Sequence, residues 1–335
     1  MKSVENDFSD VAILGAGSFG TAIAAAIARS GHRVNLYCRT SEQAHEIERT
    51  RENRRYFPGH TIPSLIHATN DIDTALAAPI VFLAFPARTI DFYAEKLCSA
   101  REHLTIVNLV KGLHQEHFTF AQLFEKQVPQ ASYVALKGPT FAKPIFLGEL
   151  SGLTCATRSI ESRRIMSALF SGSMIDLDYS SSPEAVDALS AMKNVYAVSL
   201  GIGAALGWSE NTIFLLVSQI IREMRSVLAN LGWDQEALLT YSGLGDTLLT
   251  GFCDTSRNRT LGFMMGRGLH IDTTRSGFLA EGARTIAILR DRITSPIPIV
   301  DAIIEILEHR AEPIALIEAL GIVSLTNARS QSQAC

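Results

Sequence analysis

A glycine-rich turn near the start of the chain places the strongest constraint on its fold. Gly15, Gly17 and Gly20 form a GxGxxG run that directly follows the apolar stretch DVAILG and opens the small-residue stretch TAIAAAIA. A strand, a tight glycine turn and a helix in this order are typical of domains that bind dinucleotides. The first glycine makes the sharp bend, the second lets the backbone approach a pyrophosphate, and the third lets the helix pack on the sheet. A glycine turn that holds no ligand is the alternative.

The pattern of apolar runs predicts two domains of different class. In the first half, short apolar runs alternate with helical patterns, which indicates a doubly wound, mostly parallel α/β sheet with helices on both faces. After Ser182 the strand signal stops and long helical patterns follow. We therefore predict a dinucleotide-binding Rossmann-type domain over residues 1–182. An all-α substrate domain is predicted over residues 183–335, with the boundary at the turn sequence SSSP.

The expected elements follow from the positions of these patterns. Strands are expected over residues 10–15, 33–38, 80–85, 105–110, 133–137, 152–157 and 174–178, and the first two are followed by helices over 19–30 and 41–51. Further helices are expected over residues 183–206, 211–231, 256–266, 279–292 and 298–309. The arginine-rich stretch RTRENRR (49–55) is expected to be a solvated helix end.

Composition and charge argue against several classes of protein. The formal net charge of -4 gives no electrostatic case for binding nucleic acid or an anionic membrane. The apolar runs are too short for a membrane span, and the first ten residues do not resemble a signal peptide, so we expect a cytoplasmic protein. The five cysteines are scattered without metal spacing. His114 and His117 are expected at the surface, so no metal site is expected.

A single lysine interrupts a long apolar stretch in the second half of the chain. Between Ala185 and Trp208, the only charge after Asp187 is that of Lys193. An ammonium group taken out of water needs a partner or loses its proton. If the stretch is helical, the positions three and four residues away hold no carboxylate, so a countercharge must come from elsewhere. Such a lysine is a candidate for proton transfer; the alternative is a side chain that reaches the surface along the helix.

The sequence beyond this stretch offers a carboxylate and several donors for an anion. Asp246, in the motif GLGDTLLT, could cap the helix that follows it, pair with Lys193, or do both. Ser256, Arg257 and Asn258 begin a helical pattern. A helix start that carries hydroxyl, guanidinium and amide donors is suited to a phosphate group.

Residues after three of the expected strands are candidates for ligand binding, because open α/β sheets bind ligands at the carboxyl ends of their strands. Lys111 follows one strand, and Gly138 and Thr140 follow another. Each of these could also be an ordinary loop residue. Arg39 ends the second strand, where an acidic residue would select NAD, and a guanidinium there suits the 2′-phosphate of NADP. A surface arginine without a ligand is the alternative.

Seven motifs in order resemble the NAD(P)-dependent glycerol-3-phosphate dehydrogenases of bacterial type. They are GAGSFGTAIA, VKGL, KGPTFAKP, MKNVYAV, GLGDTLLT, SRNRTLG and AEGART, and together they cover nearly the whole chain. The resemblance implies a Rossmann domain followed by a helical domain. It also implies reversible hydride transfer between NAD(P)H and dihydroxyacetone phosphate, which gives sn-glycerol 3-phosphate for phospholipid synthesis.

The resemblance further implies a role for each residue at a matching motif position. Lys193 would donate the proton to the substrate carbonyl, with Asp246 as its catalytic partner. The cofactor positions are Gly15, Gly17, Ser18, Phe19, Gly20, Arg39, Lys111, Ala142, Arg257, Leu279 and Glu281. The substrate positions are Lys111, Gly138, Thr140, Lys193, Asp246, Ser256, Arg257 and Asn258. The expected cofactor is NADP or NAD, with NADPH favoured by Arg39, and a homodimer is one possible assembly.

Two features depart from the usual pattern of that family. Ser190 and Ala191 stand where small residues, often glycine, are usual, and Lys137 stands where a serine usually precedes GPT or GPS. Lys137 could strengthen anion binding or point away from the ligand. The rival functions are a dehydrogenase for a hydroxy acid or a sugar-acid phosphate, and a nucleotide-binding regulator without catalysis. The SRNR and GLGD motifs argue against the first, and the presence of both Lys193 and Asp246 argues against the second.

Overall fold

The computed structural model describes residues 11–98, 103–269, 280–308 and 311–320, without the side chains of 280–284. The chain forms two compact units. The first extends to Asp187 and includes Thr240–Ser242, and the second begins at Ala188 and includes the remaining described residues. This division comes a few residues after the predicted domain boundary at Ser182, which remains a prediction.

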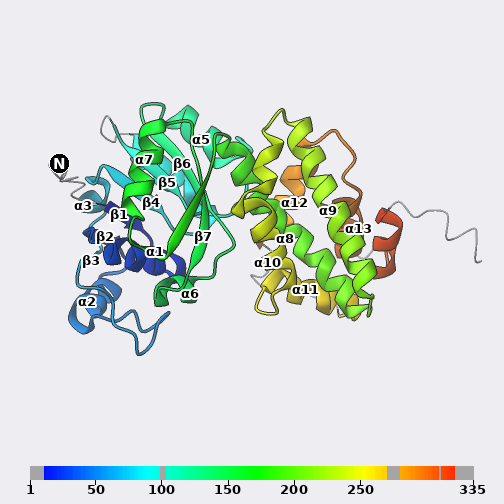
Figure 1. Ribbon diagram of the computed structural model, residues 1–335, viewed down its shortest axis with the longest axis horizontal. Coiled ribbons are helices and arrows are strands. Elements are labelled where there is room, and N and C mark those ends of the chain that lie inside the picture. Colours follow the sequence, from blue (N-terminus) through cyan, green and yellow to red (C-terminus); the bar gives the residue numbers. More distant parts are fainter. Residues whose placement is uncertain (1–10, 99–102, 270–279, 309–310, 321–335) are drawn as a thin grey trace, which may run out of the picture. The chain divides into compact units, whose positions relative to one another are not determined.

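The first unit contains an eight-stranded sheet in the order β3-β2-β1-β4-β5-β6-β7-β8 (Figure 1). Neighbouring strands are parallel except for β6 and β7, which are antiparallel, so the expectation of a mostly parallel sheet is confirmed. The strands are β1 (Val11–Leu14), β2 (Val34–Tyr37), β3 (Ile66–Thr69), β4 (Ile80–Leu83), β5 (Thr105–Asn108), β6 (Ser132–Lys137), β7 (Ser151–Ala156) and β8 (Ile175–Ser180).

Helices connect these strands and enclose the sheet between two hydrophobic cores. The helices are α1 (Ser18–Arg29), α2 (Ser41–Thr50), α3 (Ile72–Leu76), α4 (Ile90–Cys98), α5 (Phe120–Gln127), α6 (Ala142–Leu147) and α7 (Ile160–Leu169). One core joins Val11 and Ile13 to apolar residues of α1, α2, α6 and α7. The other joins Ala12 and Leu14 to residues of α3, α4 and α5. Because successive residues of a strand enter opposite cores, the central strands read as continuous apolar runs.

The arginine-rich stretch after α2 differs from the expected solvated helix end. Arg51 ends the helix in the left-handed conformation, with φ of 53°, and donates to the carbonyl oxygens of Pro63 and Ile66. Asn53 is buried, whereas Arg54 and Arg55 are exposed. The expectation is therefore wrong for Asn53, whose amide is used inside the fold.

His114 also differs from the expectation, since it is buried rather than at the surface. Its Nε2 lies 2.7 Å from Oδ1 of Asp91, and its Nδ1 accepts from the backbone N–H of His117. Within the described residues, no group of three or more histidine, cysteine, aspartate or glutamate side chains is arranged to hold a metal ion.

The described part of the second unit contains helices and no strand, as predicted. Its helices are α8 (Pro183–Ala205), α9 (Glu210–Asn230), α10 (Asp246–Phe252), α11 (Arg257–Gly266), α12 (Ala280–Arg292) and α13 (Pro298–Leu307). Glycines let α8 and α11 approach closely, because a Cβ on Gly262 would lie 1.9 Å from the carbonyl oxygen of Val198. Among the described helices, none combines the length and the apolar character that a membrane span requires.

A buried carboxylate stabilises the start of α13. Glu223 of α9 accepts hydrogen bonds from the backbone N–H groups of Ile299 and Val300, at 2.9 and 3.2 Å, and from the hydroxyl of Tyr196. These two N–H groups lack partners within their own helix, so Glu223 satisfies donors that the first turn leaves open. Burial raises the pKa of Glu223 from 4.5 to about 7, although its three hydrogen bonds oppose the rise.

The raised pKa of Glu223 predicts a pH-dependent free energy of unfolding. Between pH 4.5 and about 7 the folded protein holds a proton that the unfolded chain releases, so stability falls as pH rises through this window and is level above it. Glu223→Gln stays neutral and lacks this dependence. Urea unfolding gives the free energy of unfolding at pH 5 and at pH 8. From pH 5 to pH 8 this free energy should fall by on the order of 3 kcal/mol more in the unchanged protein than in the variant. Parallel stability curves for the two proteins would contradict the assignment.

Candidate functional site

The glycine turn has the geometry that a dinucleotide loop requires. Gly15 has a φ of +126°, and a Cβ there would lie 2.4 Å from the carbonyl oxygen of Ala84. A Cβ on Gly20 would lie 2.0 Å from the carbonyl oxygen of Gly15. Gly17 differs, since the space where its Cβ would stand has no heavy atom within 4 Å. Two of the glycines are therefore needed by the fold, whereas Gly17 leaves room beside the backbone.

The start of α1 is suited to the negative charge of a pyrophosphate. Gly17 is the N-cap, it carries no side chain to cap the helix, and no acidic residue stands in the first turn. A helix N-terminus with its N–H groups directed outward favours anions. Ser18 is exposed at this end, and Phe19 packs partly against the core of the first unit. These residues fit the pyrophosphate of NAD or NADP.

Arg39 is the second residue after the end of β2 and is exposed. The next residue, Thr40, is the N-cap of α2, and its side chain accepts from the backbone N–H of Gln43. Arg39 thus stands just before the start of α2, whose first turn holds the carboxylate of Glu42, so the positive charge that a 2′-phosphate would meet comes from the guanidinium.

Three of the predicted ligand positions follow strands that are neighbours in the sheet. Lys111 follows β5, Gly138 follows β6, and the glycine turn follows β1, which is joined to β5 through β4. Because these four strands are parallel, their carboxyl ends meet at one edge of the sheet. Thr140 is buried near this edge, and Ala142 begins α6.

Lys193 is buried in α8, with 4% of its surface exposed. Its Nζ donates to Oδ1 of Asp246 and, at 2.9 Å, to the hydroxyl of Thr250. The countercharge therefore comes from elsewhere in the chain, as expected, and the alternative of a lysine that reaches the surface is wrong. Asp246 is the first residue of α10, and the N-cap of that helix is Gly245.

The predicted phosphate donors lie together at the start of α11. Ser256 is its N-cap and accepts from the backbone N–H of Arg259. Arg257 is exposed, and the side-chain amide of Asn258 donates to Oδ1 of Asn194 at 3.0 Å. Because Asn194 directly follows Lys193, this hydrogen bond connects the start of α11 to the lysine-bearing helix.

Sequence reasoning missed two members of this group. Thr250 lies four residues after Asp246, so both side chains lie on one face of α10, and this spacing could have indicated it. Asn194 could have been indicated by its place beside Lys193. Two predicted residues cannot be placed: Leu279 is outside the described residues, and Glu281 lies in α12 with its side chain outside the description.

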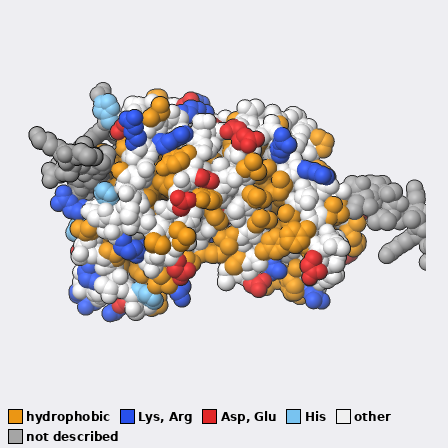
Figure 2. Space-filling model, viewed as in Figure 1, with side chains coloured by type: hydrophobic (Ala, Val, Ile, Leu, Met, Phe, Trp, Pro, Cys, Tyr) orange, Lys and Arg blue, Asp and Glu red, His pale blue; other side chains and the backbone are white. Residues whose placement is uncertain are grey.

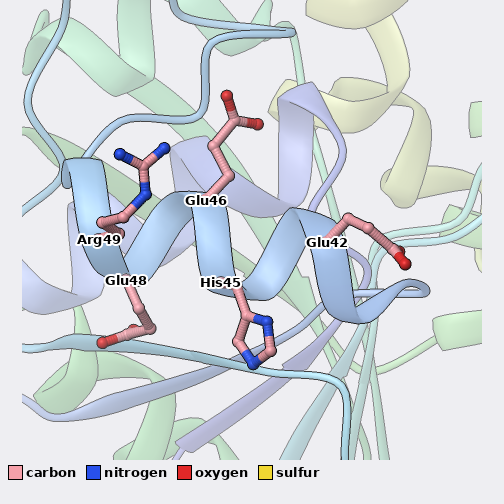
Figure 3. A pocket seen from close by; sticks show the side chains of 5 residues that line it. All are labelled: Glu42, His45, Glu46, Glu48 and Arg49. Carbon is pink, nitrogen blue, oxygen red and sulfur yellow. The ribbon is translucent and has the colours of Figure 1, made fainter.

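A surface hollow along α2 has different properties from these sites. It has a volume of about 560 Å³ and is lined by Glu42, His45, Glu46, Glu48 and Arg49. Figure 3 shows that these side chains all come from one helix and spread in different directions. Ligand sites are concave and largely apolar, with a few convergent polar groups. We therefore do not assign a ligand to this hollow.

Comparison with known proteins identifies the family. Residues 10–162 match the N-terminus of NAD-dependent glycerol-3-phosphate dehydrogenase, and residues 183–318 match its C-terminus. The chain belongs to the NAD-dependent glycerol-3-phosphate dehydrogenase family. The two matched regions include every residue that we predicted for the site.

Relatives of this dehydrogenase family match the chain over most of its length. It is 33% identical to glycerol-3-phosphate dehydrogenase [NAD(P)+] of Pseudomonas fluorescens, a match that covers 84% of this chain and 83% of the relative. It is 32% identical to the enzyme of the same name from Alcanivorax borkumensis, with 92% of each chain covered. The crystal structure of glycerol-3-phosphate dehydrogenase from Coxiella burnetii has the same fold, with a TM-score of 0.84 and 22% identity, and the match covers 94% of this chain and 99% of that one.

Lys137, which directly precedes the sequence GPT, is directed into the fold. Its side chain is completely buried, and its Nζ donates to the carbonyl oxygens of Asn108 and Val110, at 2.9 and 2.5 Å. The same Nζ lies 3.4 Å from a carboxylate oxygen of Asp187, which is also completely buried. Burial raises the pKa of Asp187, and the Lys137 charge opposes this rise. Lys137 thus binds the end of β5, just before Lys111.

Proposed function

We propose that the protein catalyses the reversible, NAD(P)-dependent interconversion of dihydroxyacetone phosphate and sn-glycerol 3-phosphate. The observation that carries this proposal is the buried ammonium of Lys193, held by Asp246 and Thr250, in a member of this family. The glycine turn supports the cofactor part of the proposal, because Gly17 and the start of α1 fit a pyrophosphate.

The chemistry needs one hydride and one proton. When bound, the reduced nicotinamide supplies the hydride that adds to C2 of the ketone. Negative charge then grows on the C2 oxygen, and Lys193 donates a proton from Nζ to that oxygen. A proton transfer of this kind contributes roughly 10²–10⁴-fold to the rate. Lys193 regains its proton from water, and in the oxidative direction it accepts the hydroxyl proton instead.

Asp246 and Thr250 position the lysine for this transfer. An ammonium has three N–H donors, and its contacts with these two side chains fix the direction of Nζ. The Asp246 carboxylate also compensates a positive charge that burial would otherwise make costly.

The phosphate group of the substrate is held by residues at the start of α11. Ser256, the guanidinium of Arg257 and the amide of Asn258 supply donors of the type that phosphate oxygens accept. Binding energy from the phosphate, which does not react, serves to align the ketone.

Loss of NADPH absorbance on addition of dihydroxyacetone phosphate tests the proposal directly. Rapid turnover is expected. No reduction of NADP+ or NAD+ is expected when a hydroxy acid or a sugar-acid phosphate is supplied with the oxidised cofactor, the direction in which those compounds would react. Turnover with one of those compounds instead would replace the proposed substrate. NADPH binding without turnover of any of them would favour a nucleotide-binding regulator.

Arg39→Ala should weaken the binding of NADPH more than that of NADH. The guanidinium would lose its charge-assisted contact with the 2′-phosphate, which is worth about tenfold or more in affinity. Fluorescence titration of the unchanged protein and the variant with each cofactor measures the effect. A preference that the substitution leaves unchanged would assign cofactor selection to other residues.

The proposed physiological role is the supply of sn-glycerol 3-phosphate for phospholipid synthesis. Residence in the cytoplasm and assembly as a homodimer stay predictions. An apolar area on the second unit is compatible with a dimer: Phe214 and Phe252 are exposed, and their rings stack at 5.7 Å. In the view of Figure 2, hydrophobic side chains gather on this unit, with charged side chains around them.

A further inference from the structure

The carbonyl group of Ala16, inside the glycine turn, is held by two side-chain amides. Nδ2 of Asn53 donates to this carbonyl oxygen at 3.1 Å, and Nε2 of Gln43 donates to it at 3.0 Å. Nδ2 of Asn53 also lies 2.9 Å from the hydroxyl of Thr21, in the first turns of α1. The two amides come from α2 and from the turn after it, so this segment is tied to the glycine turn at one atom.

Asn53 is held by burial and by hydrogen bonds of its own backbone. It is 2% exposed, and its backbone carbonyl accepts from the N–H groups of Tyr56 and Phe57. Arg51, two residues earlier, anchors the same segment through its bonds to Pro63 and Ile66. The amide therefore belongs to a buried, hydrogen-bonded turn.

The geometry of a peptide bond connects this contact to the cofactor. A trans peptide is planar, and its C=O and N–H groups point in opposite directions. The carbonyl of Ala16 and the N–H of Gly17 belong to the same peptide. Because Asn53 and Gln43 draw the carbonyl towards α2, the N–H of Gly17 is turned the opposite way. The same contacts keep a partly negative oxygen from facing the phosphate oxygens.

We propose that Asn53 and Gln43 are positioning residues that orient the Ala16–Gly17 peptide for the pyrophosphate of the cofactor. This inference rests on the NAD(P) binding of the proposed function and needs no assumption about the substrate. Both residues act through the peptide and not by touching the ligand. Asn53, which is buried and has two acceptors, has the larger effect.

Direct binding to the full-length protein tests this role without turnover. The variants are Asn53→Ala, Asn53→Asp and Gln43→Ala, with Arg55→Ala as a matched control on an exposed neighbour of Asn53. Fluorescence titration gives the Kd for NADPH, and its displacement gives the Kd for ADP-ribose and for 2′-AMP. ADP-ribose contains the pyrophosphate, whereas 2′-AMP shares the adenosine and lacks it.

The Kd for NADPH and for ADP-ribose should rise about tenfold or more in Asn53→Ala, the factor for losing one hydrogen bond to a charged group. Asn53→Asp should bind both ligands at least as weakly as Asn53→Ala, because its carboxylate has no N–H to donate. Gln43→Ala should show a rise of a few-fold, and Arg55→Ala none. The Kd for 2′-AMP should stay within about twofold in all four variants.

Two results would overturn the inference. One is an unchanged Kd for NADPH in both Asn53→Ala and Gln43→Ala. The other is an equal loss for 2′-AMP and ADP-ribose, which is expected if the substitutions only damage the fold. Gln43 is only partly buried, so Gln43→Ala keeps the test valid if the Asn53 variants do not fold. Failure of the unchanged protein to bind any dinucleotide would instead overturn the proposed function, and this inference with it.

Discussion

Replacing Lys193 by arginine is expected to lower kcat for dihydroxyacetone phosphate reduction by roughly 10²–10⁴-fold. Arginine keeps the positive charge beside Asp246, but its guanidinium does not release a proton at neutral pH. The ion pair would persist while the proton donor is lost. Stopped-flow or steady-state measurement of NADPH oxidation at saturating substrate gives kcat, and fluorescence titration should show an unchanged Kd for NADPH.

Further variants separate the loss of the proton donor from the loss of stability that comes from altering a buried ion pair. Lys193→Met removes the positive charge and leaves the buried Asp246 carboxylate without its countercharge, which costs roughly 3–5 kcal/mol of stability. Lys193→Met combined with Asp246→Asn removes both charges and should be more stable, yet equally inactive. Thr250→Val is the matched control, because it removes one hydrogen bond and keeps the donor, so its kcat should fall much less. Near-normal kcat in Lys193→Arg would exclude lysine as the acid.

Gly17→Val should abolish tight NADPH binding while leaving the fold intact. The position has a φ of -78°, which valine adopts, and no heavy atom lies within 4 Å of its Cβ site. A branched side chain would occupy the space that the pyrophosphate needs and would keep phosphate oxygens from the N–H groups of α1. We expect the Kd for NADPH to rise about 100-fold or more, equivalent to roughly two hydrogen bonds to a charged group.

The neighbouring glycines provide the control for Gly17→Val. Gly20→Ala would place a Cβ 2.0 Å from the carbonyl oxygen of Gly15, so the backbone must shift and thermal stability should drop. Gly17→Val should melt close to the unchanged protein. Normal NADPH affinity in Gly17→Val would show that the cofactor does not approach this part of the loop.

Local spacing explains which parts of the fold and site the sequence could reveal. The glycine turn was predictable because its strand, bend and helix are contiguous. The Lys193–Asp246 pair was predictable as a need for a countercharge in an apolar helix. β3 was not predicted, because the four residues IHAT carry little apolar signal and the exposed His67 interrupts it.

Long-range contacts account for what the sequence could not reveal. The amide of Asn53 meets an acceptor 37 positions earlier in the chain, and nothing in the stretch RTRENRR indicates that its asparagine is buried. The sequence left open whether Lys137 faces the ligand or points away from it, because only the folded chain brings it to Asp187. In both cases the burial of a polar residue is explained by a hydrogen-bond or ion-pair partner far away in the sequence, and no helical or strand periodicity relates the two positions.

The buried pair of Lys137 and Asp187 also limits how this sequence can change over evolutionary time. Loss of Asp187 alone takes the countercharge from a buried ammonium, which costs roughly 3–5 kcal/mol, a large part of the stability of an ordinary domain. Asp187 also accepts hydrogen bonds from the side chains of Asn108 and Tyr133 and from the backbone N–H of Ala121, so its carboxylate has a structural use apart from Lys137. The dependence is therefore one-sided: Lys137 is tolerated mainly in the background of Asp187, whereas Asp187 keeps hydrogen-bond donors without Lys137.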